Sequence, residues 1–116
     1  MHKKLRLRDN RDFKRVYKKP KAYYNRDFTV LIRENKAKNP RFGFSIGKTV
    51  GKAVVRNKLK RRLREIVRLN YSNINNVDIV IIPKKHTADF DYKRLEKSLK
   101  NVIKKAFQQK KIYYVK

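Results

Sequence analysis

The side chains best placed to do chemistry lie between residues 56 and 68. At about 100° per residue, six of them fall within a helical arc of roughly 140°: Arg56, Asn57, Lys60, Arg61, Arg64 and Arg68. Guanidinium groups hold phosphate oxygens through paired hydrogen bonds, and an asparagine amide can reach a base edge or a ribose 2′-hydroxyl. The spacing therefore predicts a helix, over about residues 54–70, that binds nucleic-acid phosphates and carries no catalytic cluster of its own.

A second arc of the same helix is apolar. Val55, Leu59, Leu63 and Ile66 fall within about 80° of one another, and we expect them to pack on the core. Like charges at i and i+4 destabilise an isolated helix by a few tenths of a kcal/mol per pair, so packing must hold this helix. Glu65 is the only acidic residue between residues 58 and 68. A charged face is often merely solvated, but here phosphates are the expected partners.

The composition also favours a polyanionic partner. The 116 residues include 35 Lys and Arg against 9 Asp and Glu, a formal charge of +26, and such self-repulsion is unfavourable without a counterion. A chain of this length fits one domain, so residues 1–116 are expected to form a single RNA-binding domain. The absence of cysteine excludes disulfides, zinc fingers and iron–sulfur sites.

Membrane and export signals are not predicted. The longest apolar run, residues 79–82, is far too short to span a bilayer. The basic residues 1–8 are not followed by the apolar region of a secretory signal. We expect a cytoplasmic protein without a membrane partner or a small-molecule substrate.

Other chemistries have weaker support. Gly43 and Gly47 are separated by three residues where a Walker phosphate-binding loop has four, so a tight turn is the better interpretation. His2 and His86 have no cysteine partner and lie among lysines, so no metal site is predicted. No Ser, His and Asp grouping is predicted either.

Aromatic residues near the N-terminus allow two interpretations. Phe13 and Tyr17, at i and i+4, could be core residues of an amphipathic helix or a surface on which unpaired bases stack. The same two alternatives hold for Tyr23, Tyr24 and Phe28.

The pattern of apolar residues predicts the elements that position these groups. Asp9 or Asn10 should cap a first helix that Pro20 stops, and Asp89 or Asp91 should cap a last helix. Strands are predicted over residues 21–24, 28–34, 41–47 and 77–83. The third strand is expected to pair with the second in a hairpin, and the fourth is expected to lie in the interior of the sheet. The tail from Gln108 should fray. The order α, β, β, β, α, β, α predicts an α/β (α+β) two-layer sandwich with helices on a mostly antiparallel four-stranded sheet.

The stretch GFSIGKTVGKAVVRNKLKR, residues 43–61, resembles a signature of the protein subunit of bacterial ribonuclease P. The resemblance extends to residues 12–17, to residues 25–28 and to the apolar strand before the last helix. It implies a left-handed βαβ crossover around the basic helix. It also implies an endoribonuclease in which a catalytic RNA, using magnesium, removes the 5′ leader of precursor tRNA, while the protein binds the RNA and the leader without being catalytic.

Carried over by position, the resemblance assigns RNA contact to the basic helix and the turn before it: Lys48, Arg56, Asn57, Lys58, Lys60, Arg61, Arg64 and Arg68. It assigns a leader cleft to Phe13, Tyr17 and Phe28. This sequence departs from the family pattern with Lys58 for Arg, Thr49 for Lys and Leu31 for an aromatic. Lys58 keeps the charge but loses the planar fork of arginine.

Two other classes compete with this interpretation. A structural RNA-binding protein, such as a ribosomal protein, would have a similar charge and helix. A protein-only nuclease would need acidic metal ligands, and Asp78, Asp89 and Asp91 are few and suit strand or cap positions.

Overall fold

Helices and strands follow one another in the predicted order. The structure, a computed structural model, describes residues 5–115. Its elements are α1 (Asn10–Tyr17), β1 (Lys21–Tyr24), β2 (Phe28–Glu34), β3 (Arg41–Phe44), the 3-10 turn η2 (Lys48–Val50), α2 (Ala53–Tyr71), β4 (Val77–Pro83), the 3-10 turn η3 (Lys85–Asp89) and α3 (Tyr92–Gln108). The expected α-β-β-β-α-β-α order is confirmed.

The four strands form a mixed sheet in the order β1-β2-β4-β3. β1 pairs with β2 and β2 with β4 in antiparallel register, whereas β3 pairs with β4 in parallel. The predicted hairpin between the second and third strands is therefore wrong, because β4 lies between them. The interior place of β4 is confirmed, and it explains why residues 77–83 are apolar without alternation.

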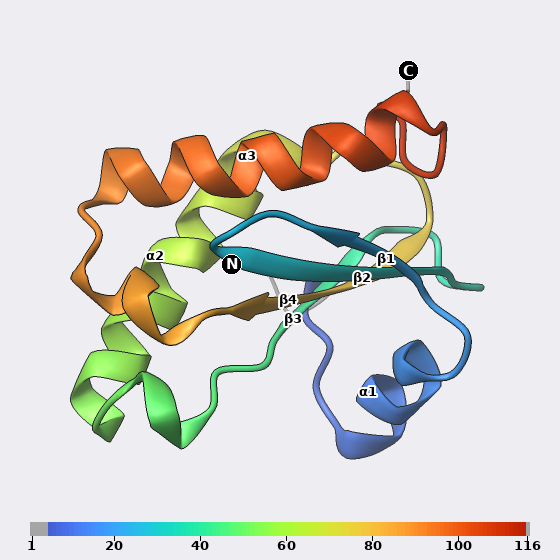
Figure 1. Cartoon of the computed structure of the whole chain (residues 1–116). Coiled ribbons are helices and arrows are strands. Elements are labelled where there is room, and N and C mark those ends of the chain that lie inside the picture. The colour runs from blue at the N-terminus through green and yellow to red at the C-terminus, as the bar shows by residue number, and fades with distance from the viewer. Residues whose placement is uncertain (1–4, 116) are drawn as a thin grey trace.

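Alternating side chains along the strands divide the core into two clusters. Phe28, Val30 and Ile32 of β2 join the apolar sides of α2 and α3. Leu31, between them, joins Val16 of α1 on the opposite face. Figure 1 shows α3 and α1 on opposite sides of the sheet. The sandwich of α2 and α3 on the sheet thus gains partial cover from α1 on its other face.

Aspartates cap the first and last helices. The Asp9 side chain accepts a hydrogen bond from the Asp12 backbone N–H at 3.0 Å, and Asp91 accepts one from Arg94 at 2.8 Å. These are the N-caps that the sequence allowed, and they satisfy amides that have no partner within the helix.

The C-terminal segment is packed, which contradicts the predicted fraying. Ile112 is buried, and Tyr114 forms a β-bridge with Ile74. The backbone N–H of Val115 donates to the Asn73 carbonyl at 2.8 Å. Sequence periodicity ends with α3, so this pairing over about 40 residues of sequence left no local signal.

Because β3 and β4 are parallel neighbours, α2 is the crossover that joins them. Its left-handed sense remains a prediction from the resemblance. Across residues 5–115, no helix is long and apolar enough to cross a membrane.

Candidate nucleic-acid interface

α2 presents its cations because its opposite side is fixed in the core. Leu59, Leu63 and Ile66 are buried, as predicted, and Val67 joins them. Val55, in the first turn of α2, is the exception, with 37% of its surface exposed. The remainder of the helix surface is held toward solvent in a fixed orientation.

The turn before α2 is specific in its geometry. Gly51 has φ of 154°, a value that side chains rarely adopt, and a Cβ there would lie 3.0 Å from the Val55 side chain. Arg56 Nε donates to the Gly51 carbonyl at 3.1 Å, which ties this guanidinium to the turn. Lys48 is exposed one turn earlier, in η2. Glycine at position 51 therefore sets how Lys48 and Arg56 are displayed.

Three predicted contact residues are fully available. Asn57, Lys58 and Arg61 are exposed, and within residues 5–115 their side chains have no hydrogen bond or ion pair. Arg68 differs, since its guanidinium makes a bidentate pair with Glu65, with N–O distances of 2.7 and 3.2 Å. Glu65, the single acidic residue of this stretch of α2, thus neutralises Arg68 at the C-terminal end of the basic face.

The main electrostatic feature of the interface is a convergence of three cations. Arg6, whose backbone bridges to Phe42 of β3, lies close to Lys60 and Arg64 of α2. Burial, and then the charges of Arg64 and Arg6, lower the pKa of Lys60 below its usual value. Burial and Arg6 likewise lower the pKa of Arg64.

Within residues 5–115, no carboxylate pairs with this convergence. The Nε atoms of Arg6 and Arg64 are buried without a hydrogen-bond partner among the described residues. A buried donor without a hydrogen-bond partner is energetically costly. An anion placed between these groups would accept hydrogen bonds from the two Nε atoms and would offset the repulsion among the three cations. Sequence reasoning missed Arg6, because its place beside α2 comes from a bridge to β3 that no local pattern indicates.

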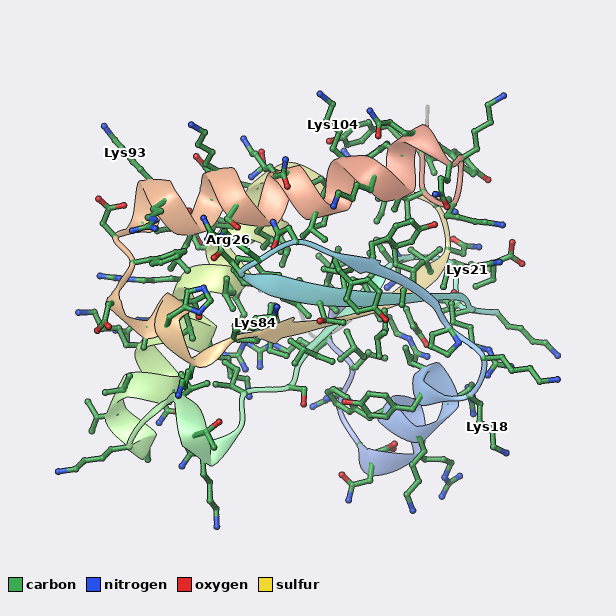
Figure 2. All side chains as sticks on the ribbon, viewed as in Figure 1. Lys18, Lys21, Arg26, Lys84, Lys93 and Lys104 are labelled. Carbon is green, nitrogen blue, oxygen red and sulfur yellow. The ribbon has the colours of Figure 1, made fainter. Side chains whose placement is uncertain are left out.

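Charge alone would not single out this face. Lysines project over the whole surface in Figure 2, with Lys93 and Lys104 extending outward from α3 and Lys18 beyond α1. These are solvated positions. What distinguishes α2 is that Lys60 and Arg64, together with Arg6, are partly desolvated and have no ion pair within the part of the chain that the structure describes.

The aromatic residues of α1 are divided between core and surface. Phe13 packs with the cluster under α1, whereas Tyr17 keeps 46% of its surface exposed. Tyr24 is 59% exposed and pairs in register with Thr29. Since Leu31 points to the α1 face, Thr29 and Tyr24 do so too. Tyr17 and Tyr24 are thus exposed rings on the same side of the sheet.

Phe28 was predicted to line a leader cleft, and this is wrong. Its exposed fraction is 0%, and it packs with α2 and α3 on the other face of the sheet. Neighbouring residues of a strand point to opposite faces of the sheet, so the sequence alone did not reveal which aromatic rings are exposed. Tyr23 is also buried, and its hydroxyl bonds to Gln109 at 3.1 Å.

The structure brings Ser98, Asp27 and His86 together, a grouping not predicted. Ser98 Oγ donates to Asp27 Oδ2 at 2.6 Å, and His86 Nε2 lies 2.7 Å from Asp27 Oδ1. The carboxylate lies between the other two, so the imidazole does not reach the serine as a general base must. This cluster joins η3, α3 and the β1–β2 turn and offers no nucleophile.

Two of the carboxylates considered for a nuclease, Asp78 and Asp91, are structural. Asp78 is buried and makes a bidentate pair with Arg41, with both N–O distances at 2.8 Å. Asp91 is the α3 cap. Within residues 5–115, no group of three or more His, Cys, Asp or Glu side chains could hold a metal ion.

Comparison with known proteins decides the family. The sequence profile of the family described as Ribonuclease P matches residues 1–107. The chain belongs to the ribonuclease P protein family. It is 52% identical to the ribonuclease P protein component of Finegoldia magna over 111 residues, which is 95% of this chain and 97% of the relative. It is 39% identical to that of Clostridium botulinum, covering 90% and 96%.

Solved ribonuclease P proteins share the fold. The Staphylococcus aureus RNase P protein superposes with a TM-score of 0.82 at 38% identity, covering 88% of this chain and 94% of that one. The Thermotoga maritima RNase P protein gives 0.78 at 39% identity, covering 86% and 96%. The resemblance predicted from residues 43–61 is confirmed, and the ribosomal-protein alternative is not supported. As a ribonuclease P protein component, the chain is part of an endoribonuclease complex.

Proposed function

We propose that this ribonuclease P protein binds the catalytic RNA of its complex through α2 and the 5′ leader of precursor tRNA through the α1 face. The complex would then remove the leader by endonucleolytic cleavage and form the mature 5′ end. The observation that carries the proposal is the convergence of Arg6, Lys60 and Arg64, which has no counterion among the described residues. A phosphate of an RNA supplies the missing negative charge.

The rest of the α2 face suits an RNA backbone. Arg56 is oriented by the Gly51 carbonyl, and Asn57, Lys58 and Arg61 are unpaired among the described residues. These groups can hold several phosphates and leave the Asn57 amide for a base edge or 2′-hydroxyl. Lys48 and Arg68 extend the face at its two ends, with Arg68 weakened by Glu65.

The leader is assigned to the opposite face of the sheet. Tyr17 and Tyr24 offer exposed rings there, and the partly buried Phe13 belongs to the cluster under α1 on the same face. Stacking on aromatic side chains tolerates any base, which suits leaders of different sequence. Tyr24 thus takes the place that the sequence had given to Phe28.

In this proposal the RNA performs the hydrolysis and holds the magnesium. The protein's residues position RNA and neutralise phosphate charge, which lowers the magnesium concentration needed for the RNA segments to approach one another. No side chain of the chain is assigned a catalytic role.

Reconstitution tests the proposal. The folded protein is added to a bacterial ribonuclease P RNA at low magnesium, and precursor tRNA cleavage is measured. We expect a large gain in cleavage rate, and a smaller one for the Arg6→Gln and Arg64→Gln variants. No gain with folded protein would contradict the proposal.

A further inference from the structure

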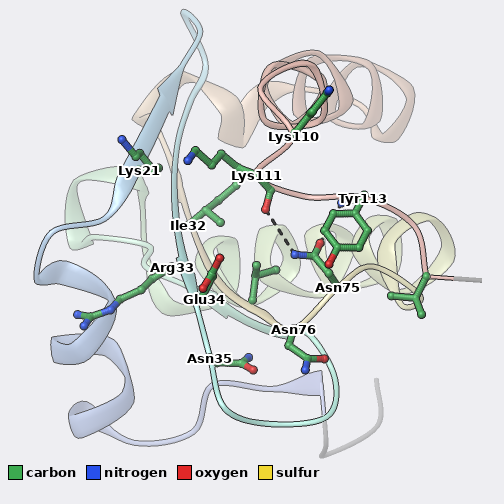
Figure 3. A pocket seen from close by; sticks show the side chains of 12 residues that line it. Lys21, Ile32, Arg33, Glu34, Asn35, Asn75, Asn76, Lys110, Lys111 and Tyr113 are labelled. Atoms are coloured by element: carbon green, nitrogen blue, oxygen red, sulfur yellow. Dashed lines mark hydrogen bonds between the residues drawn. The ribbon is translucent and has the colours of Figure 1, made fainter.

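A cavity of about 960 Å³ lies at one end of the sheet, away from the turn that precedes α2 (Figure 3). The starts of β1 and β4, the end of β2 and the segment after α3 enclose it. That turn follows the carboxyl end of β3, which is parallel to β4. The cavity and the turn are therefore separated by the seven residues of β4, about 20 Å.

Lysines line this cavity from two sides. Lys21 enters from β1, and Lys110 and Lys111 enter from the segment after α3. Figure 3 shows the Lys111 side chain reaching toward β1, where Lys21 lies. All three are exposed, and their ammonium groups have no hydrogen bond or ion pair among residues 5–115. Glu34 is the only carboxylate of the lining, so its charge is outnumbered.

Lys110 has a backbone conformation that is less favourable for lysine than for glycine. Its φ is 58°, the left-handed conformation in which glycine is preferred. The backbone N–H of Lys110 donates to the Phe107 carbonyl at 3.0 Å, and the backbone N–H of Lys111 donates to the Ala106 carbonyl at 3.0 Å. This is the Schellman ending of a helix, whose usual left-handed residue is glycine. Residues with such strained backbone conformations cluster at functional sites.

An aromatic ring and an amide complete the lining. Tyr113 is 57% exposed, and its backbone is fixed by two hydrogen bonds of 2.9 Å with Asn75. Asn76 is exposed, and its side-chain amide has no partner within the described residues. An exposed ring on a fixed backbone can stack on a base, and an amide can bond to a base edge.

We propose that this cavity holds an unpaired nucleotide of an RNA, with the base on Tyr113 and the phosphates beside Lys21, Lys110 and Lys111. This second contact rests on the proposed function, since it assumes that the partner is RNA. Further lysines project from neighbouring parts of the chain, with Lys104 on α3 and Lys18 between α1 and β1 (Figure 2). Several cations outside the cavity suit the successive phosphates of a polymer better than a small phosphorylated molecule.

Cross-linking tests the cavity and the proposed function separately. The chain has no cysteine, so Tyr113→Cys and Arg61→Cys each give one position for a photoreactive label. With ribonuclease P RNA and precursor tRNA present, we expect RNA cross-links from both positions. Cross-links from Arg61→Cys alone would overturn the cavity assignment and leave the proposed function intact. Cross-links from neither would contradict the proposed function, and those from Tyr113→Cys alone would support the cavity only.

A pair of glycine variants tests the use of Lys110. Lys110→Gly relieves the left-handed strain, so it should raise the melting temperature, yet flatten the salt dependence of RNA binding by about 0.7 to 0.9 in log–log slope. Lys19→Gly is the matched control, because Lys19 has φ of 52° and lies outside the cavity lining. It should raise the melting temperature with a smaller change in slope. Equal changes in slope would overturn the proposal, as would binding of adenosine monophosphate without RNA cross-links from Tyr113→Cys.

Discussion

The ring of Phe13 occupies the space that a side chain at Gly43 would need. A Cβ at position 43 would lie 2.6 Å from Phe13 Cζ and 2.7 Å from Cε1. Gly43 belongs to β3 and Phe13 to α1, so this contact joins the first helix to the strand that leads into the basic helix. The helix assigned to the leader is thus packed against the strand that precedes the basic helix.

Substituting Gly43→Ala should therefore destabilise the protein. The Phe13 ring must move, and such overpacking costs about 1 to 3 kcal/mol in free energy of unfolding. Gly47→Ala is the control, because a Cβ there would meet only Thr49 Oγ1, at 3.8 Å. Urea denaturation of both variants measures the difference, and equal stabilities would contradict the contact.

Replacing Arg64 should separate stability from binding. Arg64→Met removes a partly buried charge next to Arg6 and Lys60, so the free energy of unfolding should stay the same or rise by up to about 1 kcal/mol. Affinity for the catalytic RNA should fall, with a salt slope roughly 0.7 to 0.9 shallower. A marked loss of stability in thermal unfolding would show that Arg64 has a structural partner instead.

Arg61 and Arg68 should differ although both are exposed arginines of one helix face. Arg61→Ala should weaken RNA binding with little change in stability, because its side chain is free. Arg68→Ala should weaken it less, since Glu65 already pairs with Arg68. Glu65→Gln should strengthen binding by releasing Arg68. Titration of the RNA at several salt concentrations orders the three variants, and any other order contradicts this interpretation.

Asp27 should contribute to stability at neutral pH. Burial alone would raise its pKa, but hydrogen bonds from Ser98 and His86 outweigh burial and hold the pKa below its usual value. A lowered carboxyl pKa stabilises the fold above the unfolded value of about 3.9, and this stabilisation is lost as pH falls through the folded value.

Asp27→Asn should therefore lower the free energy of unfolding at pH 7 by about 1 to 3 kcal/mol. The variant should also lose less stability than the wild type between neutral and acid pH. Denaturation across this pH range measures both effects, with Asp89→Asn as an exposed control. A parallel loss in both proteins would contradict the role of Asp27.

Much of the fold followed from local chemistry. Asp9 and Asp91 cap helices because backbone N–H groups in the first turn need a hydrogen-bond acceptor. The mostly apolar run of residues 77–83 predicted a strand in the interior of the sheet. Strand pairing did not follow, because the partner of β3 depends on the path of α2 rather than on the residues of β3. The packed tail depends in the same way on distant residues, through the bridge of Ile74 to Tyr114.

In the candidate interface too, features set by one helix were predictable and features set by distant contacts were not. Helical periodicity gave the outward face of α2, because one helix determines it. Phe28 was misplaced and Tyr24 left open, because the face of a ring on a strand depends on register with its neighbours. Arg6 was missed because its proximity to Arg64 arises only in the folded chain.

The most direct test of the central claim is the affinity of the reconstituted holoenzyme for precursor tRNA compared with mature tRNA. We expect tighter binding of the precursor, a preference that Tyr17→Ala and Tyr24→Ala reduce and Tyr17→Phe retains. Equal affinities of the wild-type holoenzyme for the two tRNAs would contradict leader binding by the protein.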